Sequence, residues 1–228
     1  MARERSADQV KNDFVSTIPQ GAGELAHWLW SDIAHLHMNW NNYRALFATN
    51  KETVDLLNAI ASSYFRMTER VLRQDTLMRI CRITDPPFSD RARKKPNASL
   101  RHLLLRLSES LAEELSLKVE SSLEALDELS APIRALRDKR FAHSDVDEVL
   151  QLRVDPLPGV SRQRIEDVLA KMREVFELLE GHFLDSSTAF EHVVQTDDAR
   201  KLIHHLKQAR SFEEIEKIVI SRQFGPAR

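Results

Sequence analysis

The 228-residue sequence is poor in residues that make turns, with 5 Gly and 8 Pro, and it has one cysteine, Cys81. The shortage of turn residues favours a few long elements over many short strands. A single cysteine excludes an internal disulfide, which fits a reducing compartment. Cys81 lies in a helical apolar pattern, so we predict a packed small side chain rather than a nucleophile.

Long apolar runs and a strong net charge are also missing. No stretch approaches the ~20 apolar residues of a membrane helix, and residues 1–9 are charged and polar, unlike a signal peptide. We therefore expect a cytoplasmic protein with no membrane partner. The 33 basic and 35 acidic residues give a net charge of -2. Any attraction for nucleic acid must therefore be local.

Apolar residues recur at spacings of three and four along most of the chain, which predicts amphipathic α-helices. With 42% hydrophobic residues the chain can bury a sizeable core. We expect an all-α protein, an elongated helical bundle with short C-terminal helices. The predicted helices cover residues 10–18, 25–47, 51–84, 100–107, 109–129, a segment from 131, 162–194, 198–209 and a last segment from 212. The capping box Ser211-Phe212-Glu213-Glu214 predicts the start of the last one.

One bundle is expected over residues 1–195, with 196–228 as a C-terminal helical extension packing on it. The extended segment 149–154 is predicted to be a loop. Residues 88–99 form a basic loop with Arg91, Arg93, Lys94 and Lys95. This loop is either a solvated charge run or an arm that grips phosphate, and both interpretations remain open.

The histidines do not predict a metal site. His27, His35 and His37 include no pair at the four-residue spacing that places two ligands on one helix face. His204 and His205 are adjacent, so they diverge on a helix. We predict no metal and no cofactor.

The stretch Arg137-Asp138-Lys139-Arg140-Phe141-Ala142-His143-Ser144-Asp145 concentrates the chemistry. It follows Ser130-Ala131-Pro132, which is typical of a helix start because Ser can cap and Pro is tolerated in the first turn. An imidazole near pKa 6.5 can exchange a proton with a ribose hydroxyl at neutral pH. A guanidinium can bind phosphate and stabilise charge in the transition state.

Arg137 and His143 lie about 120° apart around an ideal helix, so they do not share one face. A long Arg side chain, an unwound turn near Ala142, or a two-fold pair of motif helices would bring them together. Asp138 can orient Arg137, accept a hydrogen bond from His143, or remain a solvated carboxylate. A cation-rich helix end with a His is also common without any catalytic role, since it complements the helix dipole.

An Arg, a polar residue and a short spacer ending in His resemble the signature of the HEPN superfamily, all-helical domains that include metal-independent ribonucleases. Here Arg137 and Asp138 fill the first two positions, and five residues separate Arg137 from His143. The chain also resembles a HEPN branch linked to phage abortive infection. That likeness rests on residues 40–47, on Arg82-Ile83-Thr84-Asp85-Pro86 and on the 137–145 segment, and it covers roughly residues 25–190.

The resemblance implies Arg137 and His143 as catalytic residues, with Asp138 supporting them. We further predict that four basic residues bind the substrate: Lys139, Arg140, Arg134 and Arg82. The implied activity is a metal-independent endoribonuclease of a phage-defence or toxin type, in which a 2′-hydroxyl attacks the adjacent phosphate. The implied partners are an RNA substrate, a second copy in a homodimer, and an antitoxin protein.

The alternative is a non-catalytic interaction or regulatory module with the HEPN fold. In that case Arg137 and His143 would be a structural pair. A nucleotide-binding function is disfavoured, because the sequence has no Gly-rich phosphate loop.

Overall fold

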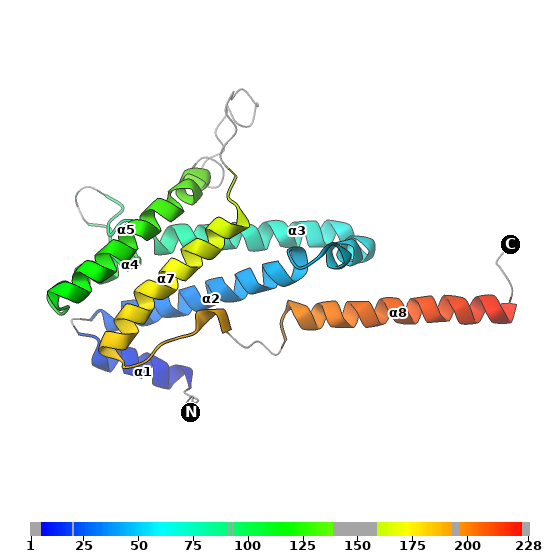
Figure 1. Cartoon of the computed structure of the whole chain (residues 1–228), viewed down its shortest axis with the longest axis horizontal. Coiled ribbons are helices and arrows are strands. Elements are labelled where there is room, and N and C mark those ends of the chain that lie inside the picture. The colour runs from blue at the N-terminus through cyan, green and yellow to red at the C-terminus, as the bar shows by residue number, and fades with distance from the viewer. Residues whose placement is uncertain are drawn as a thin grey trace, which may run out of the picture. The chain divides into compact units, whose positions relative to one another are not determined.

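The computed structural model describes residues 6–19, 21–90, 92, 94–138, 159–192 and 197–224. These residues form seven α-helices: α1 (Ala7–Thr17), α2 (Gly23–Phe47), α3 (Lys51–Ile83), α4 (Leu100–Leu107), α5 (Glu113–Leu136), α7 (Arg162–Phe183) and α8 (Ala199–Phe224) (Figure 1). A short 3₁₀ helix, η2, spans Phe190–His192. Within the described residues, β-pairing is limited to one bridge between Phe88 and Pro96. The prediction of an all-α protein is confirmed.

Several helix starts follow the capping residues that the sequence offers. The Ser6 hydroxyl accepts a hydrogen bond from the Gln9 amide, the Asn50 side chain from the Thr53 amide, and Ser161 from the Arg164 amide. Each cap satisfies an amide that has no partner inside its own helix. α3 ends at Ile83, two residues before Asp85-Pro86-Pro87, because a residue before proline disfavours helical geometry.

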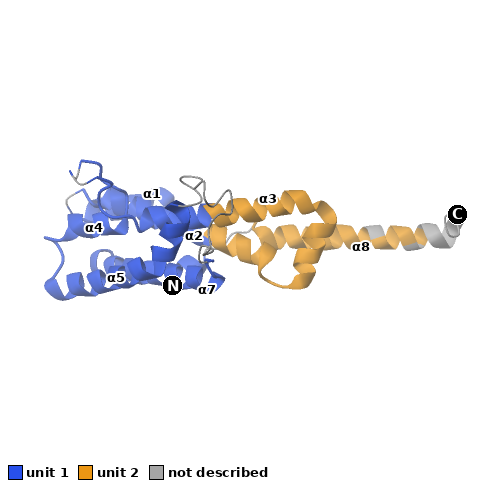
Figure 2. Cartoon of the chain, turned by 90° about the horizontal axis from the view of Figure 1, so that it is seen from above, with its two compact units in different colours: residues 1–37, 75–192 blue, residues 38–74, 193–228 orange. Residues whose placement is uncertain are grey.

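The chain divides into two compact units (Figure 2). Unit 1 comprises residues 1–37 and 75–192, and unit 2 comprises residues 38–74 and 193–228. This grouping cuts the chain at other places than the expected boundary at residue 195. The domain boundary at residue 195 stays a prediction.

Unit 1 is built around a core of side chains from all of its helices, in which α5 packs along α7 and α4 packs on α5 (Figure 1). Its fully buried side chains include Leu29, Ile33, Ile80, Ile83, Leu103, Val119, Ile133, Val168, Met172 and Phe190. Cys81 is fully buried, as predicted, and burial raises the pKa of its thiol to about 11.

Unit 2 contains the end of α2, the larger part of α3, and α8. Its core consists of Leu46, Leu57, Phe65 and Ala199, with Ile203 and Leu206 of α8 packed against it. The side-chain oxygen of Asn42 accepts a hydrogen bond of 3.0 Å from the Ala199 amide at the start of α8. Inside α3, Ala61 has a non-helical backbone (φ -156°, ψ 67°), which kinks this helix.

The predicted helix start at Ser130-Ala131-Pro132 is wrong. α5 continues through Pro132 to Leu136, so the predicted helices over 109–129 and from 131 are one helix. The buried Ser130 hydroxyl donates back to the Leu126 carbonyl oxygen at 2.7 Å instead of capping a new helix. Packing of α5 on α7 holds the backbone helical here, despite the amide hydrogen that Pro132 lacks.

The predicted continuation of the helix after Ser161 towards Val194 is also wrong. α7 ends at Phe183, and Asp185 takes a left-handed backbone (φ 46°), which Asp tolerates better than most residues. The buried Glu180 carboxylate then accepts hydrogen bonds from the amide and the hydroxyl of Thr188, at 2.8 and 2.7 Å. These bonds turn the chain back before η2.

The two short C-terminal helices are a single helix, α8. Ser211, predicted to cap a second helix, lies inside α8 and donates its hydroxyl to the Lys207 carbonyl oxygen at 3.0 Å. Residues 199–224 contain neither Gly nor Pro, so nothing in the local sequence interrupts the helix. Residues 139–158, which include the extended segment 149–154, lie outside the described part of the chain.

Candidate functional site

The described part of the motif lies where the last turn of α5 meets the last turn of α3. Arg137 directly follows α5, and its backbone is still helical (φ -56°, ψ -52°), with its amide donating to the Ile133 and Arg134 carbonyls. Its side chain reaches Asp85, just beyond α3. The meeting of two helix ends therefore positions the guanidinium.

Two carboxylates hold the Arg137 guanidinium. Its Nη1 donates to Oδ1 of Asp85 at 2.8 Å, and its Nε donates to Oδ1 of Asp138 at 2.9 Å. The Arg137 side chain is 23% exposed. Partial burial alone would lower the pKa of Arg137, but the hydrogen bonds to Asp85 and Asp138 raise it above its ordinary value. The side chain is a fixed positive charge at any pH the protein encounters.

Arg134 lies one turn earlier on α5 and ties the same two helix ends together. Its guanidinium donates to the hydroxyl of Thr84 at 3.1 Å, to the hydroxyl of Ser130 at 2.6 Å, and to the carbonyl of Asp127 at 2.9 Å. These bonds make Arg134 a clamp between α3 and α5. The predicted contact between Arg134 and RNA stays a prediction.

Arg82 faces α2. Its Nη2 donates to both carboxylate oxygens of Asp32, at 2.8 and 2.7 Å, and its guanidinium lies over the Trp28 ring at 5.3 Å from the centroid. Arg79 pairs with the same buried carboxylate. The side chain of Arg82 is half-exposed, and its predicted role in substrate binding is likewise untested.

The other predicted site residues, Lys139, Arg140 and His143, lie outside the described residues. In the basic loop, the Asp90 carboxylate accepts hydrogen bonds from the amides of Lys94 and Lys95, at 2.9 and 3.1 Å. These two hydrogen bonds do not distinguish a solvated loop from an arm that grips phosphate, so both interpretations stay open.

Sequence comparison adds the family. A sequence model of the AbiU2 family, a family of HEPN domains, matches residues 20–202. The chain belongs to the AbiU2 family. The match covers the whole motif and the ends of α3 and α5, and it leaves out residues 1–19 and 203–228, which include most of α8. Neither the curated proteins nor the solved structures that were searched gave a match.

Within this AbiU2-family chain, sequence reasoning missed Asp85 as a site residue. Asp85 stands at the C-terminal end of a helix, where a carboxylate opposes the helix dipole. That unfavourable position is a signal in the sequence that the carboxylate has a cationic partner. The partner is Arg137, 52 residues along the chain.

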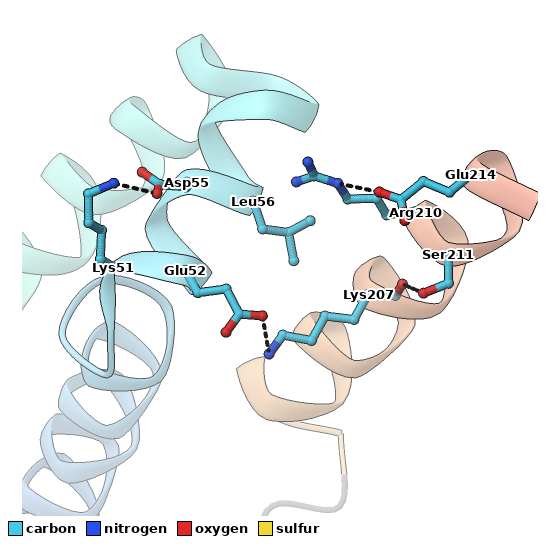
Figure 3. A pocket seen from close by; sticks show the side chains of 8 residues that line it. All are labelled: Lys51, Glu52, Asp55, Leu56, Lys207, Arg210, Ser211 and Glu214. Atoms are coloured by element: carbon cyan, nitrogen blue, oxygen red, sulfur yellow. Dashed lines mark hydrogen bonds and ion pairs between the residues drawn. The ribbon is translucent and has the colours of Figure 1, made fainter. Parts of the chain in front are cut away.

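One pocket of unit 2 contains no motif residue. It has a volume of about 600 Å³ and lies between the start of α3 and the middle of α8 (Figure 3). Lys207 pairs with Glu52 at 3.4 Å across it, and Leu56 points into it. Its acids and bases alternate, so it offers no field of one sign to a charged ligand.

Two kinds of feature are absent from the described residues. No three His, Cys, Asp or Glu side chains there are grouped so that they could hold a metal ion. No described helix has both the length and the apolar character required to cross a bilayer.

Proposed function

We propose that this AbiU2-family protein is a metal-independent endoribonuclease of a phage-defence or toxin type, with Arg137 and His143 as its catalytic pair. The observation that supports this proposal most directly is the state of Arg137. Its guanidinium is fixed by Asp85 and Asp138, and its Nη2 has no hydrogen bond to any described residue. An arginine carries two N–H groups on Nη2, and these are available to a phosphate.

The proposed reaction is an internal transesterification of RNA. The 2′-hydroxyl loses its proton to an imidazole, and the 2′-oxygen attacks the adjacent phosphorus. The bond to the 5′-oxygen then breaks, and that oxygen takes up a proton. The products are a 2′,3′-cyclic phosphate and a 5′-hydroxyl. Arg137 stabilises the extra negative charge that the phosphate oxygens carry during attack.

His143 is the proposed proton carrier, and Asp138 is a positioning residue that holds the plane of the Arg137 guanidinium. We infer a homodimer in which two motifs face one RNA strand. Two copies would supply one imidazole as base and another as acid. Lys139, Arg140, Arg134 and Arg82 are the proposed phosphate contacts around this pair.

RNA cleavage in EDTA tests the proposal. We expect the purified protein to cut structured cellular RNA, and we expect Arg137→Ala to reduce the rate roughly 100- to 1,000-fold, as for the loss of one transition-state donor. Arg173→Ala is the matched control, because Arg173 is a similarly half-buried arginine of unit 1, paired with Glu191. Full activity of Arg137→Ala would refute the role of Arg137.

A second candidate function, a non-catalytic interaction module, is favoured by the same two carboxylates. Asp85 and Asp138 accept hydrogen bonds from Nη1 and Nε of Arg137, as the carboxylates of a purely structural ion pair would. This candidate predicts that Arg137→Ala lowers the melting temperature and that the wild-type protein leaves RNA intact. Expression in a host separates the two further. A toxin slows growth and its His143→Ala variant does not, and an antitoxin partner would restore growth.

A further inference from the structure

The outer face of α3 carries an apolar strip that no described residue covers. Tyr64, Met67 and Val71 are 58%, 47% and 53% exposed. They follow one another at spacings of three and four residues, so they lie in line on one side of the helix. The core of unit 2 is on another side of α3, at Phe65 and Leu72. Three large apolar side chains gathered on one exposed face of a helix are typical of an interaction surface.

The second half of α8 carries an apolar strip with the same spacing. Phe212, Ile215 and Val219 are 74%, 57% and 46% exposed. Since each residue advances about 100° around a helix, this strip points away from Ile203 and Leu206, which pack on the core of unit 2. The strip of α8 also lies outside residues 20–202, which match the AbiU2 family.

The charges beside the two strips are opposite. Arg66, Arg70 and Arg73 of α3 are exposed and form no ion pair with a described residue. Ser63, Arg66, Met67 and Arg70 line a hollow of about 460 Å³. On α8, Glu216 directly follows Ile215 and is exposed. A basic edge on one apolar strip and an acidic edge on the other make the two strips complementary.

We propose that the second half of α8 docks on the outer face of α3 in a second copy of this chain. The strips Tyr64-Met67-Val71 and Phe212-Ile215-Val219 have identical spacing, so side chains of one helix fit between those of the other, as in a coiled coil. Each copy supplies one α3 and one α8, and the dimer contains the contact twice.

The helices pair in parallel. A parallel pairing brings the side of α3 with Ser63 and Arg70 against the side of α8 with Glu216, whereas an antiparallel pairing brings it against Ser211. Within unit 2, α3 beyond its kink and α8 run in opposite directions (Figure 1). A two-fold axis across the helices reverses one copy, so α8 of one copy runs parallel to α3 of the other. A two-fold axis perpendicular to the helices is therefore compatible with the parallel pairing that the charges favour.

Two other occupants of the α3 face fit less well. Pairing of α3 with α3 of a second copy would bring its arginines together, which is repulsive. An RNA strand would satisfy Arg66, Arg70 and Arg73, but it would leave Met67 and Val71 without apolar partners. The acidic, apolar segment of α8 satisfies both the charges and the apolar side chains.

Cross-linking between two single-cysteine variants tests the contact. Full-length Met67→Cys and Ile215→Cys proteins are mixed and mildly oxidised. We expect a disulfide-linked pair that neither variant forms alone, because the native Cys81 is buried. Leu117→Cys is the control for Met67→Cys, since Leu117 is exposed on α5 of unit 1. A mixture of Met67→Cys and Ile215→Cys that cross-links no better than this control overturns the proposal.

Charge reversal is a second test of the contact between α3 and α8. We expect Arg66→Glu with Arg70→Glu on the Met67→Cys protein to lower the cross-linking yield roughly tenfold. We expect Glu216→Lys on the Ile215→Cys protein to restore that yield. If the reversed arginines leave the yield unchanged and abolish retention of RNA, the face binds RNA and the proposal is wrong. The outcome is independent of RNA cleavage, which tests Arg137 and His143.

Discussion

At the scale of single residues, burial decides what the titratable groups can do. Cys81 is fully buried at the end of α3 and has its thiol pKa raised to about 11, first by burial and further by Asp85 and Asp138. The nearby Arg137 and Arg134 oppose that shift without cancelling it. A thiol in this state is neither accessible nor ionised at neutral pH.

Cys81 should therefore be inert in the folded protein. We expect no reaction of native protein with a chromogenic disulfide reagent at pH 7.5, and one thiol per chain after unfolding in guanidinium chloride. Met67→Cys, with its exposed position on α3, is the positive control for reagent access. Rapid labelling of the native wild-type thiol would contradict the packing around Cys81.

His37 makes the stability of the protein depend on pH. Its ring is buried against Phe190, at 5.8 Å between centroids, and its Nε2 has no hydrogen-bond partner among the described residues. Burial lowers the pKa of His37 from 6.5 to about 4, with Arg173 adding to the effect and Glu191 opposing it. Because the folded-state value is lower, the unfolded chain takes up this proton first as the pH falls.

The free energy of unfolding should therefore decrease as the pH falls from 6.5 towards 4, by at most about 3 kcal/mol from this group. Above pH 6.5 the contribution is fully present. Urea denaturation of the wild type and of His37→Leu across this range measures it, and we expect the slope to be smaller in the variant. The exposed His182→Leu should keep the wild-type slope. Equal slopes for His37→Leu and wild type would refute this assignment.

At the scale of elements, the sequence predicted the helices better than their ends. The starts of α1, α3, α4 and α7 follow Ser or Asn caps, and the stop of α3 follows from the prolines after it. Ser130 and Ser211 misled the prediction because the same side chain that caps a helix can bond back to a carbonyl inside one. Local sequence does not distinguish these two states, and tertiary packing does.

The pairings between helices were also beyond the sequence. The motif predicted that Arg137 is special, but its partner Asp85 is 52 residues away, and only the meeting of α3 with α5 brings them together. In the same way, the pairing of Arg82 with Asp32 on α2 joins residues 50 positions apart, and only the packing of α3 on α2 brings them together. Asp32 lies in a helix with a continuous apolar face, and the local sequence around a single aspartate does not predict that it is buried.

Substitution of Asp32 should lower the free energy of unfolding more than substitution of most other polar residues. Its carboxylate is buried and pairs with Arg79 and Arg82, so Asp32→Ala removes the carboxylate that Arg82 pairs with and leaves Arg79 paired only with Asp75. We expect a loss of about 3 kcal/mol in the free energy of unfolding, measured by urea denaturation. Asp55→Ala removes an exposed pair with Lys51, which solvent screens, and should cost far less. Equal costs for the two variants would contradict the buried network.

At the scale of the whole molecule, the sequence motif and the family agree on a HEPN domain. The AbiU2 match covers residues 20–202, close to the range over which the sequence resembled this branch. The described structure adds a guanidinium that two carboxylates hold in one orientation. It also adds the strips on α3 and α8, which become visible only when burial is known.

The chemistry of the RNA ends tests the central claim most directly. A short RNA that the protein cuts is prepared with a single 2′-deoxy sugar at the cut site and incubated in EDTA beside the all-ribose strand. We predict a 2′,3′-cyclic phosphate and a 5′-hydroxyl from the ribose strand, no cut at the deoxy sugar, and no products with His143→Ala. Cleavage at the deoxy sugar, or equal cleavage by His143→Ala, would contradict an Arg137–His143 ribonuclease.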